Sequence, residues 1–251
     1  MEDKSDAGAL ARGLALMQAI ATNGPMNLKD LAATTGIPKA TASRMVGTLL
    51  STGYLRQSEG SALLRLGPAF LVSGNAYLND IDVRDMLRPH LQGVANLAGA
   101  KVNVGVRNGL EIVVVDSIAP RNAAILSYVK IGDRMDLATS ASGRAYIASL
   151  NAEARLAVFE ELRDARPSAW RSISSRLRDA VAEFEAHGYC SSFGEWHPEI
   201  NAIGVVVRGA AGECFTVNCG GPIYKLTPDL LRRQVAPSLL RAVEDLTLPG
   251  K

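Results

Sequence analysis

The stretch GIPKATASRMV combines a turn with a run of hydrogen-bond donors. Pro38 has the fixed φ that suits the first turn of a helix. On such a helix the small, hydroxyl and basic side chains lie opposite the apolar ones. The residues on or beside this polar edge are Lys39, Ala40, Thr41, Ser43 and Arg44. Hydroxyls and cations near a helix N-terminus are groups that bind phosphates and base edges, so the stretch predicts contact with DNA.

Each of these side chains has an expected role. Arg44 is the candidate for base reading because a guanidinium matches guanine O6 and N7 with two hydrogen bonds, and a phosphate contact is the alternative. Lys39 is a candidate phosphate contact, and Ala40 is small enough for close approach. Arg56, farther along, would follow the DNA backbone or the minor groove. Residues 39–65 hold four Lys or Arg against one Glu, which agrees with a phosphate-binding surface.

A second group of candidate residues begins in TSASGRAYIASL, residues 139–150, which is typical of a loop entering a helix. The backbone N–H groups of Ala141 and Ser142 would face an anion at that helix start. Donors of this kind inside an apolar cup suit a carboxylate ligand.

Catalysis is poorly supported by the same sequence. Cys219 and His197 are a conceivable Cys/His pair, but no third residue to orient them is evident. The segment SASG lacks the Gly-x-Ser-x-Gly pattern of a nucleophile elbow. His90, His187 and His197 lack the spacing of metal ligands. We therefore expect no enzyme, no metal and no cofactor.

The elements that position the first group form a small helical unit. Helices are predicted over residues 9–21 and 28–35, with Asn27 as an N-cap and Gly36 as a left-handed C-cap. The helix from Pro38 follows, and then a hairpin over residues 54–57 and 62–66. This order is a helix-turn-helix with a wing. An unspecialised three-helix bundle, with Arg44 merely solvated, is the alternative.

The remaining chain mixes helices with strands. A helical segment over residues 67–79 could join the domains and pair with a second copy, and a helix over 81–97 has Pro89 as an expected kink. Strands are predicted at 101–106, 110–118, 123–129, 201–208 and 214–220. Two helices are expected between 151 and 187, and a last one over 227–246. The pattern indicates an α+β domain with a mostly antiparallel sheet.

Length and composition agree with two unequal soluble domains. The chain has 251 residues, of which 47% are apolar and 21% are charged. Its formal charge of +2 lies in residues 1–66, which hold seven Lys or Arg and five Asp or Glu. There is no run of about 18 apolar residues and no basic, apolar leader, so we expect no membrane partner and a cytoplasmic location. The three cysteines lack a Cys-x-x-Cys spacing and are expected to be buried, reduced thiols.

The chain resembles the IclR family of bacterial transcriptional regulators over nearly its whole length. RGLALMQAI is similar to the family's first helix, and LKDLAATTGIPKATASRMVGTLLSTGYL to its helix-turn-helix. LLRLG resembles the return strand of the wing, although Leu64 stands where an aromatic residue is common. SASGRAYIAS, GYCSSFGEWHPEINAIGVVVR and VNCGGP resemble segments of the effector domain.

This resemblance implies three parts. They are a winged helix-turn-helix DNA-binding domain over residues 1–66, a linker helix over 67–79, and a GAF-like effector-binding domain over 80–251. It also implies a homodimer, or a homotetramer made of two dimers, on a near-palindromic operator in double-stranded DNA. The effector would be a small organic acid.

Further effector-binding residues follow from the resemblance, and they map to Ser192, Ala202, Asn218 and Gly220. Ser192 and Asn218 would be the side chains that hydrogen-bond the ligand. No Lys or Arg occupies these positions. Ala202 and Gly220 would leave a roomier, less polar cup, which favours an aromatic or hydroxy-aromatic acid. Trp196 is expected either over the mouth of the cup or in ordinary surface packing.

The predicted function is that of a ligand-responsive, DNA-binding transcriptional regulator. One alternative is a DNA-binding, dimerising protein without a small-molecule switch. A Cys/His-dependent enzyme is a remote alternative.

Overall fold

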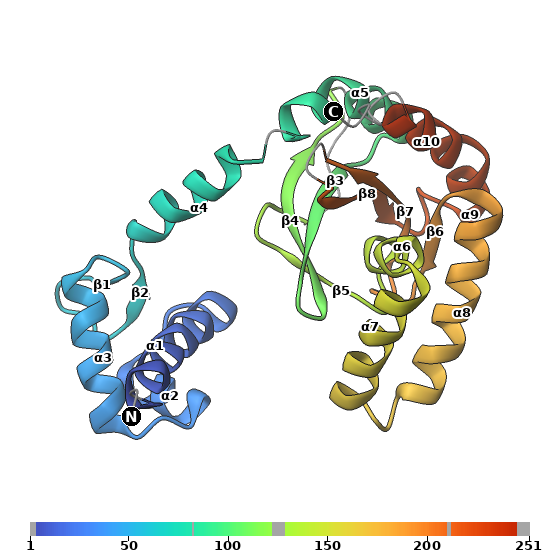
Figure 1. The fold of residues 1–251 in the computed structure, drawn as a ribbon. Coiled ribbons are helices and arrows are strands. Elements are labelled where there is room, and N and C mark those ends of the chain that lie inside the picture. The colour runs from blue at the N-terminus through green and yellow to red at the C-terminus, as the bar shows by residue number, and fades with distance from the viewer. Residues whose placement is uncertain (1–3, 82, 122–128, 210–211, 245–251) are drawn as a thin grey trace. The chain divides into compact units, whose positions relative to one another are not determined.

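The structure is a computed structural model that describes residues 4–81, 83–121, 129–209 and 212–244. The chain divides into two compact units, residues 1–81 and 82–251. The first runs from blue to cyan and the second from green to red in Figure 1. Among the described helices, none is both long and apolar enough to cross a membrane.

The N-terminal unit packs three helices against a short hairpin. Helix α1 spans Lys4–Asn23, α2 Leu28–Thr35 and α3 Lys39–Ser51, while strands β1 (Leu55–Gln57) and β2 (Leu64–Leu66) pair antiparallel. One apolar cluster from all these elements forms the core, and its members include Leu16, Ile20, Leu31, Ala42, Val46, Leu55 and Leu64. The predicted helix-turn-helix with a wing is confirmed. Helix α1 starts earlier than its apolar pattern indicated.

The turn between α2 and α3 is set by local chemistry. Asn27 caps α2, because its Oδ1 accepts a hydrogen bond from the backbone N of Asp30 at 2.9 Å. The Asp30 carboxylate in turn accepts from Asn27 Nδ2 at 2.7 Å. Gly36 ends the helix with a φ of 67°, in the left-handed region that glycine adopts without strain. Both predicted caps are confirmed, and they fix where α3 begins.

Helix α4, Ala69–Asn79, follows the wing and contains no buried residue. Its first turn is fixed to the wing, because the rings of Phe70 and Tyr54 meet edge to face with centroids 5.2 Å apart. Beyond that contact, Leu71 and Val72 are 75% and 73% exposed. The helix therefore presents apolar side chains that the rest of the described N-terminal unit does not cover.

The second unit is built on one six-stranded sheet in the order β5-β4-β3-β8-β7-β6. The strands are β3 (Val102–Asn108), β4 (Glu111–Ile118), β5 (Arg134–Asp136), β6 (Cys190–Phe193), β7 (Ile200–Arg208) and β8 (Cys214–Pro222). Every pairing given by the structure within this sheet is antiparallel. The predicted α+β class with an antiparallel sheet is confirmed, and the two predicted strand clusters join through β3 and β8.

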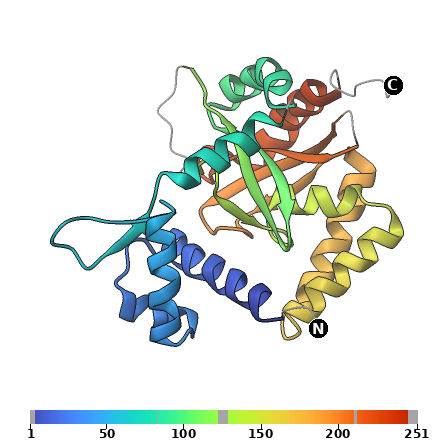
Figure 2. The same cartoon turned by 60° about the vertical axis from the view of Figure 1, so that its left-hand side comes forward.

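Helices cover both faces of the sheet (Figures 1 and 2). Helices α5 (Val83–Ala98) and α10 (Ala236–Glu244) pack against each other, α5 contacting β3 and β4 and α10 contacting β7. Helix α6 (Ala141–Ser149) lies on β7 and β8. Helices α7 (Ala152–Ala165) and α8 (Trp170–His187) pack outside it. The start of α6 is thereby held against the middle of the sheet.

Three details differ from the sequence prediction. The predicted strand 123–129 falls almost entirely outside the described residues, and β5 is the strand that pairs with the outer edge of β4. The short edge strand β6 was not predicted. The last helical region consists of α9 (Pro228–Leu230), a π-helical segment (Leu231–Val235) and α10 instead of one regular helix. Thr227 caps it as expected, since its Oγ1 accepts from the backbone N of Leu230.

Candidate functional site

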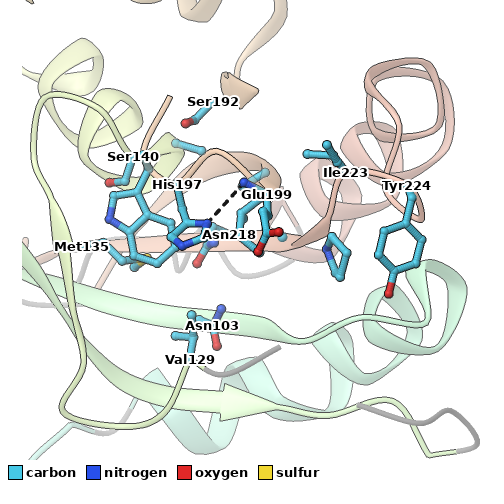
Figure 3. Close-up of a pocket in the computed structure, with 16 residues that line it drawn as sticks. Asn103, Val129, Met135, Ser140, Ser192, His197, Glu199, Asn218, Ile223 and Tyr224 are labelled. Carbon is cyan, nitrogen blue, oxygen red and sulfur yellow. Dashed lines mark hydrogen bonds between the residues drawn. The ribbon is translucent and has the colours of Figure 1, made fainter. Parts of the chain in front are cut away.

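A cavity of about 590 Å³ lies in the second unit between the start of α6, one face of the sheet and the segments that follow β6 and β8 (Figure 3). Five of the six residues predicted to bind an effector line it: Ala141, Ser192, Ala202, Asn218 and Gly220. The other lining residues are Asn103, Val129, Met135, Ser140, Trp196, His197, Glu199, Ile200, Pro222, Ile223 and Tyr224. Trp196 lines this cavity and also packs against a buried apolar cluster, so its two expected placements both stay open.

The start of α6 brings backbone donors to the cavity. Ser140 is the N-cap, and its Oγ accepts from the backbone N of Gly143 at 3.0 Å. The N–H groups of Ala141 and Ser142 precede the first possible intrahelical bond, so the helix itself leaves them without an acceptor. The Ser142 side chain does not line the cavity, and its hydroxyl is buried without a hydrogen-bond partner. Of the six residues predicted to bind an effector, Ser142 is therefore the one that does not line the cavity.

Glycine at position 204 allows α6 to lie this close to the sheet. A Cβ at Gly204 would stand 2.6 Å from the backbone carbonyl carbon and oxygen of Ala141 and 2.9 Å from the backbone N of Ser142. Real Cβ contacts of that length do not occur, so a side chain here would displace the helix start. Gly204 thus sets the distance between the donor groups of α6 and the strands below them.

Two asparagines form the polar part of the sheet face. Asn218 on β8 lies directly opposite Gly204 on β7 and Asn103 on β3. Asn103 Oδ1 accepts a hydrogen bond from Ser117 Oγ at 2.8 Å. Asn218 is 6% exposed, and its Oδ1 is buried without a partner. Leaving a buried polar atom unpaired is costly unless a ligand or water pairs with it.

Ser192 is oriented by a bond to the chain. Its hydroxyl donates to the carbonyl oxygen of Thr139 at 2.8 Å, so its remaining capacity toward the cavity is as an acceptor. A carboxylate also accepts only, and Ser192 therefore suits a ligand donor better than the acid group it was predicted to bind.

Small side chains widen the middle of the cavity. Ala202 pairs with Ser192 on one side and with Gly220 on the other. A Cβ at Gly220 would lie 2.8 Å from that of Ala202, so the pair leaves room only while position 220 stays glycine. The roomier, less polar cup expected from these two residues stays a prediction.

A buried ion pair supports the wall that carries Trp196. Arg144 on α6 is 4% exposed, and its guanidinium donates to both carboxylate oxygens of Glu195 at 2.6 and 2.7 Å. It also donates to the backbone oxygens of Ala138 and Ser191. The hydrogen bonds from Arg144 hold the pKa of Glu195 below its ordinary value against the opposing effect of burial. The segment after β6 is therefore attached directly to α6.

A chain of polar contacts leads from the cavity to α5. Ser117, which bonds Asn103, donates its backbone N–H to Asp116 Oδ1 at 2.8 Å. Asp116 is fully buried, and the same oxygen accepts from Arg88 Nη2 on α5 at 2.5 Å. The bond from Arg88 therefore connects helix α5 to strand β4 beside the cavity.

Charge around the cavity is sparse. The lining includes the carboxylate of Glu199 and the imidazole of His197 but neither Lys nor Arg. His197 Nδ1 accepts from the backbone N of Glu199 at 3.2 Å. A carboxylate ligand would therefore be held by neutral donors at the start of α6 and on the sheet.

The geometry does not assemble a Cys/His pair or a metal site in the described residues. Cys219 is buried and outside the cavity lining, and burial raises the pKa of its thiol to about 12. His197 is exposed at the cavity. No group of three His, Cys, Asp or Glu among the described residues could hold a metal ion. All three cysteines are free, with Cys190 and Cys219 buried and Cys214 half-buried.

In the N-terminal unit, α3 exposes its predicted polar edge. Lys39, Ala40, Ser43 and Arg44 are exposed and Thr41 is half-buried, whereas Ala42 and Val46 face the core. Pro38 precedes α3 and supplies no side-chain cap, so the first amides of α3 are free to meet an anion. Arg56 is exposed on the wing, and its Nε donates to the backbone oxygen of Leu66 at 3.2 Å, which orients the guanidinium.

Sequence reasoning missed three polar residues of the cavity. Ser140 could have been found, because a serine before a helix start is an N-cap signal. Glu199 lies in an irregular segment with no periodic pattern. Asn103 sits within an apolar strand, and only the register between β3 and β8 places it opposite Asn218.

A winged helix-turn-helix joined to an α+β unit with a cavity is the architecture of a ligand-binding class of DNA-binding regulators. The family model "IclR helix-turn-helix domain" matches residues 9–59, and "Bacterial transcriptional regulator IclR C-terminal" matches residues 75–248. The chain belongs to the IclR family.

Relatives agree over nearly the whole chain. The chain is 27% identical to the regulator TsaQ1/TsaQ2 of Comamonas testosteroni over 241 residues, covering 95% of this chain and 86% of that protein. It is 23% identical to the transcriptional repressor IclR of Escherichia coli, and the match covers 96% of this chain and 89% of that protein. A crystal structure of an IclR-family regulator from Brucella abortus matches this structure with a TM-score of 0.86 at 33% sequence identity. The match covers 99% of this chain and 95% of that chain. These relatives are named as regulators, so this chain is a transcriptional regulator and not an enzyme.

Proposed function

We propose that this regulator responds to a small organic acid bound in the cavity beside α6. The observation that carries the proposal is the buried amide of Asn218, which faces an otherwise mostly apolar cavity without a partner. The free N–H groups at the start of α6 supply donors for a carboxylate. A regulator from Microbacterium hydrocarbonoxydans with the same fold, at 17% identity and a TM-score of 0.69, has a crystal structure in complex with 4-hydroxybenzoate.

A thermal-shift screen tests this proposal. The purified full-length chain is heated with keto acids, short dicarboxylates, sugar acids, benzoates and aliphatic hydroxy acids. A ligand that binds only the native state raises the melting temperature with concentration. One chemical class should do so, and the same class should change operator affinity in a gel-shift or fluorescence-anisotropy assay. A flat screen would favour the alternative of a DNA-binding, dimerising protein without a switch.

The DNA-contacting surface is proposed to be the exposed edge of α3 together with Arg56 on the wing. The side chains of Lys39 and Arg44 make no ion pair or hydrogen bond within the described residues, so their cations are available for phosphates or bases. Arg44→Ala should weaken operator binding by about 1–3 kcal/mol if the guanidinium reads a base. Arg171→Ala, which removes an exposed charge from α8 of the second unit, is the matched control. Equal operator affinities for the two variants would remove Arg44 from the interface.

Self-association is proposed to involve α4. Its uncovered Leu71 and Val72 give a second copy an apolar stripe to pack against, and a two-fold pair of α3 helices would suit a near-palindromic operator. Leu71→Glu should lower the molar mass measured by light scattering toward that of a monomer. An unchanged mass would place the interface elsewhere.

A further inference from the structure

The row Gly204, Asn218 and Asn103 runs straight across strands β7, β8 and β3. Directly paired residues on neighbouring antiparallel strands lie about 5 Å apart. Because Gly204 abuts the first turn of α6, Asn218 is the next position out from the helix donors and Asn103 the one after. A ligand whose carboxylate is bound at the α6 amides would therefore extend along this row toward the two asparagines.

The side-chain amides of Asn103 and Asn218 need different hydrogen-bond partners. Asn103 Oδ1 is already bonded to Ser117, so Asn103 has its Nδ2 donor left for the cavity. Figure 3 shows that nitrogen on the side of Asn103 toward Asn218. The Asn218 side chain has no hydrogen bond in the described structure, so its amide offers both an acceptor and a donor. A ligand group between them must donate to one amide and accept from the other.

A hydroxyl is the smallest group that does both. A plain carboxylate accepts only and would leave Asn218 Oδ1 unpaired, at the cost of an unsatisfied buried acceptor. The oxygen of Ser192, whose proton is donated to Thr139, is a further acceptor in the lining, in a different row of the sheet and two strands away from Asn218. A second carboxylate on the ligand would add to the negative charge of Glu199, and the described lining residues include neither Lys nor Arg to neutralise it.

We infer that the effector is a monocarboxylic hydroxy acid whose hydroxyl is on the carbon next to the carboxylate, or ortho to it on an aromatic ring. Asn218 and Asn103 together recognise that hydroxyl, and Asn103 is a specificity-determining residue of the pocket. This inference rests on the proposed function, because it concerns the ligand of the same cavity.

Matched pairs of acids test the inference on the full-length protein. Lactate is compared with propionate, mandelate with phenylacetate, and salicylate with benzoate, by calorimetric titration. In the pair whose carbon skeleton fits, the hydroxy acid should bind about tenfold more tightly, as expected for one or two added hydrogen bonds. Asn103→Ala and Asn218→Ala should bring that ratio to within about twofold. Asn108→Ala, which removes an exposed asparagine at the end of the same strand β3, should leave it unchanged.

A second pair of variants separates recognition from folding. Asn218→Ser keeps a donor and an acceptor and should retain part of the preference for the hydroxy acid. Ser117→Ala frees the Asn103 amide to rotate and should reduce the preference without removing any ligand contact. Circular dichroism spectra confirm that each variant is folded before titration.

The outcomes separate this inference from the proposed function. If acids bind but hydroxylated and unhydroxylated partners bind equally, the hydroxyl inference is overturned while an acid-responsive regulator stands. The hydroxyl inference is also overturned if Asn103→Ala retains the full preference. If no acid of any kind binds, the inference and the proposed function fail together.

Discussion

Replacing Gly204 with alanine tests the close packing between α6 and the sheet. The added methyl carbon would lie 2.6 Å from the Ala141 carbonyl group, where ordinary contacts begin near 3.4 Å. The start of α6 would have to move by about 0.8 Å, and the atoms in the way are backbone, which cannot rotate aside. Overpacking of this kind costs about 1–3 kcal/mol of the free energy of unfolding. In a domain of this size each kcal/mol lowers the melting temperature by about 2–4 °C, so a fall of about 2–12 °C is expected.

The assay is differential scanning calorimetry of the full-length protein, with Gly93→Ala as the control. A Cβ at Gly93, on α5 in the same unit, would meet nothing within 4 Å. Alanine should therefore stabilise that helix by about 0.5–1 kcal/mol. The same transition should move down for Gly204→Ala and up for Gly93→Ala. A Gly204→Ala protein that melts at or above the wild-type temperature would refute the packing argument. Weaker binding of the effector should accompany the loss of stability, because the donors of Ala141 move.

Three further predictions concern local interactions. Arg144 lowers the pKa of Glu195. The ion pair therefore stabilises the fold at pH values above the ordinary glutamate pKa of 4.5, and this contribution is lost as the pH falls through the lowered pKa. Urea unfolding at pH 7 and at acidic pH should show a smaller acid-induced loss for Arg144→Met than for wild type; an unaltered pH dependence would contradict it. Iodoacetamide at pH 8 should modify native Cys219 far more slowly than Cys214, because Cys219 is buried and its pKa is raised to about 12; equal rates by mass spectrometry would be inconsistent with that burial. Asn27→Ala should lower the stability of the N-terminal unit by about 1 kcal/mol, measured by thermal unfolding followed by circular dichroism, and no loss would mean that the cap is dispensable.

Elements with strong local signals could be predicted from the sequence. The Asn27 cap, the Gly36 stop and the apolar faces of α2 and α3 depend on neighbouring residues, and they located the helix-turn-helix correctly. Strands β3, β4 and β7 are long and rich in β-branched residues, and β8 begins with the mostly apolar run Cys-Phe-Thr-Val, so their positions were also evident.

Short elements with no pattern of their own could not be predicted. β5 and β6 have three and four residues, and their pairing with longer strands, not their composition, makes them strands. The π-helical turn at Leu231–Val235 likewise leaves no mark on helical periodicity. Such features depend on contacts with residues far away in the sequence.

The cavity, too, could be predicted from the sequence only in part. Five of the six residues predicted to bind an effector do line it, but the hydrogen-bonding state of each depends on long-range geometry. Ser192 was expected to hydrogen-bond the ligand, yet its proton is directed to Thr139, fifty-three residues earlier in the chain. Asn103 became a cavity residue only through strand register.

The attachment of Glu195 to the buried Arg144 has a consequence for binding kinetics. A wall held by a bidentate ion pair and a further hydrogen bond to the Ser191 carbonyl oxygen does not have to fold over the ligand after it enters. Association should then be limited by diffusion and by entry into the cavity. Related acids should therefore enter at similar rates and differ in how long they stay, so that stopped-flow traces would place their selectivity in the dissociation rate.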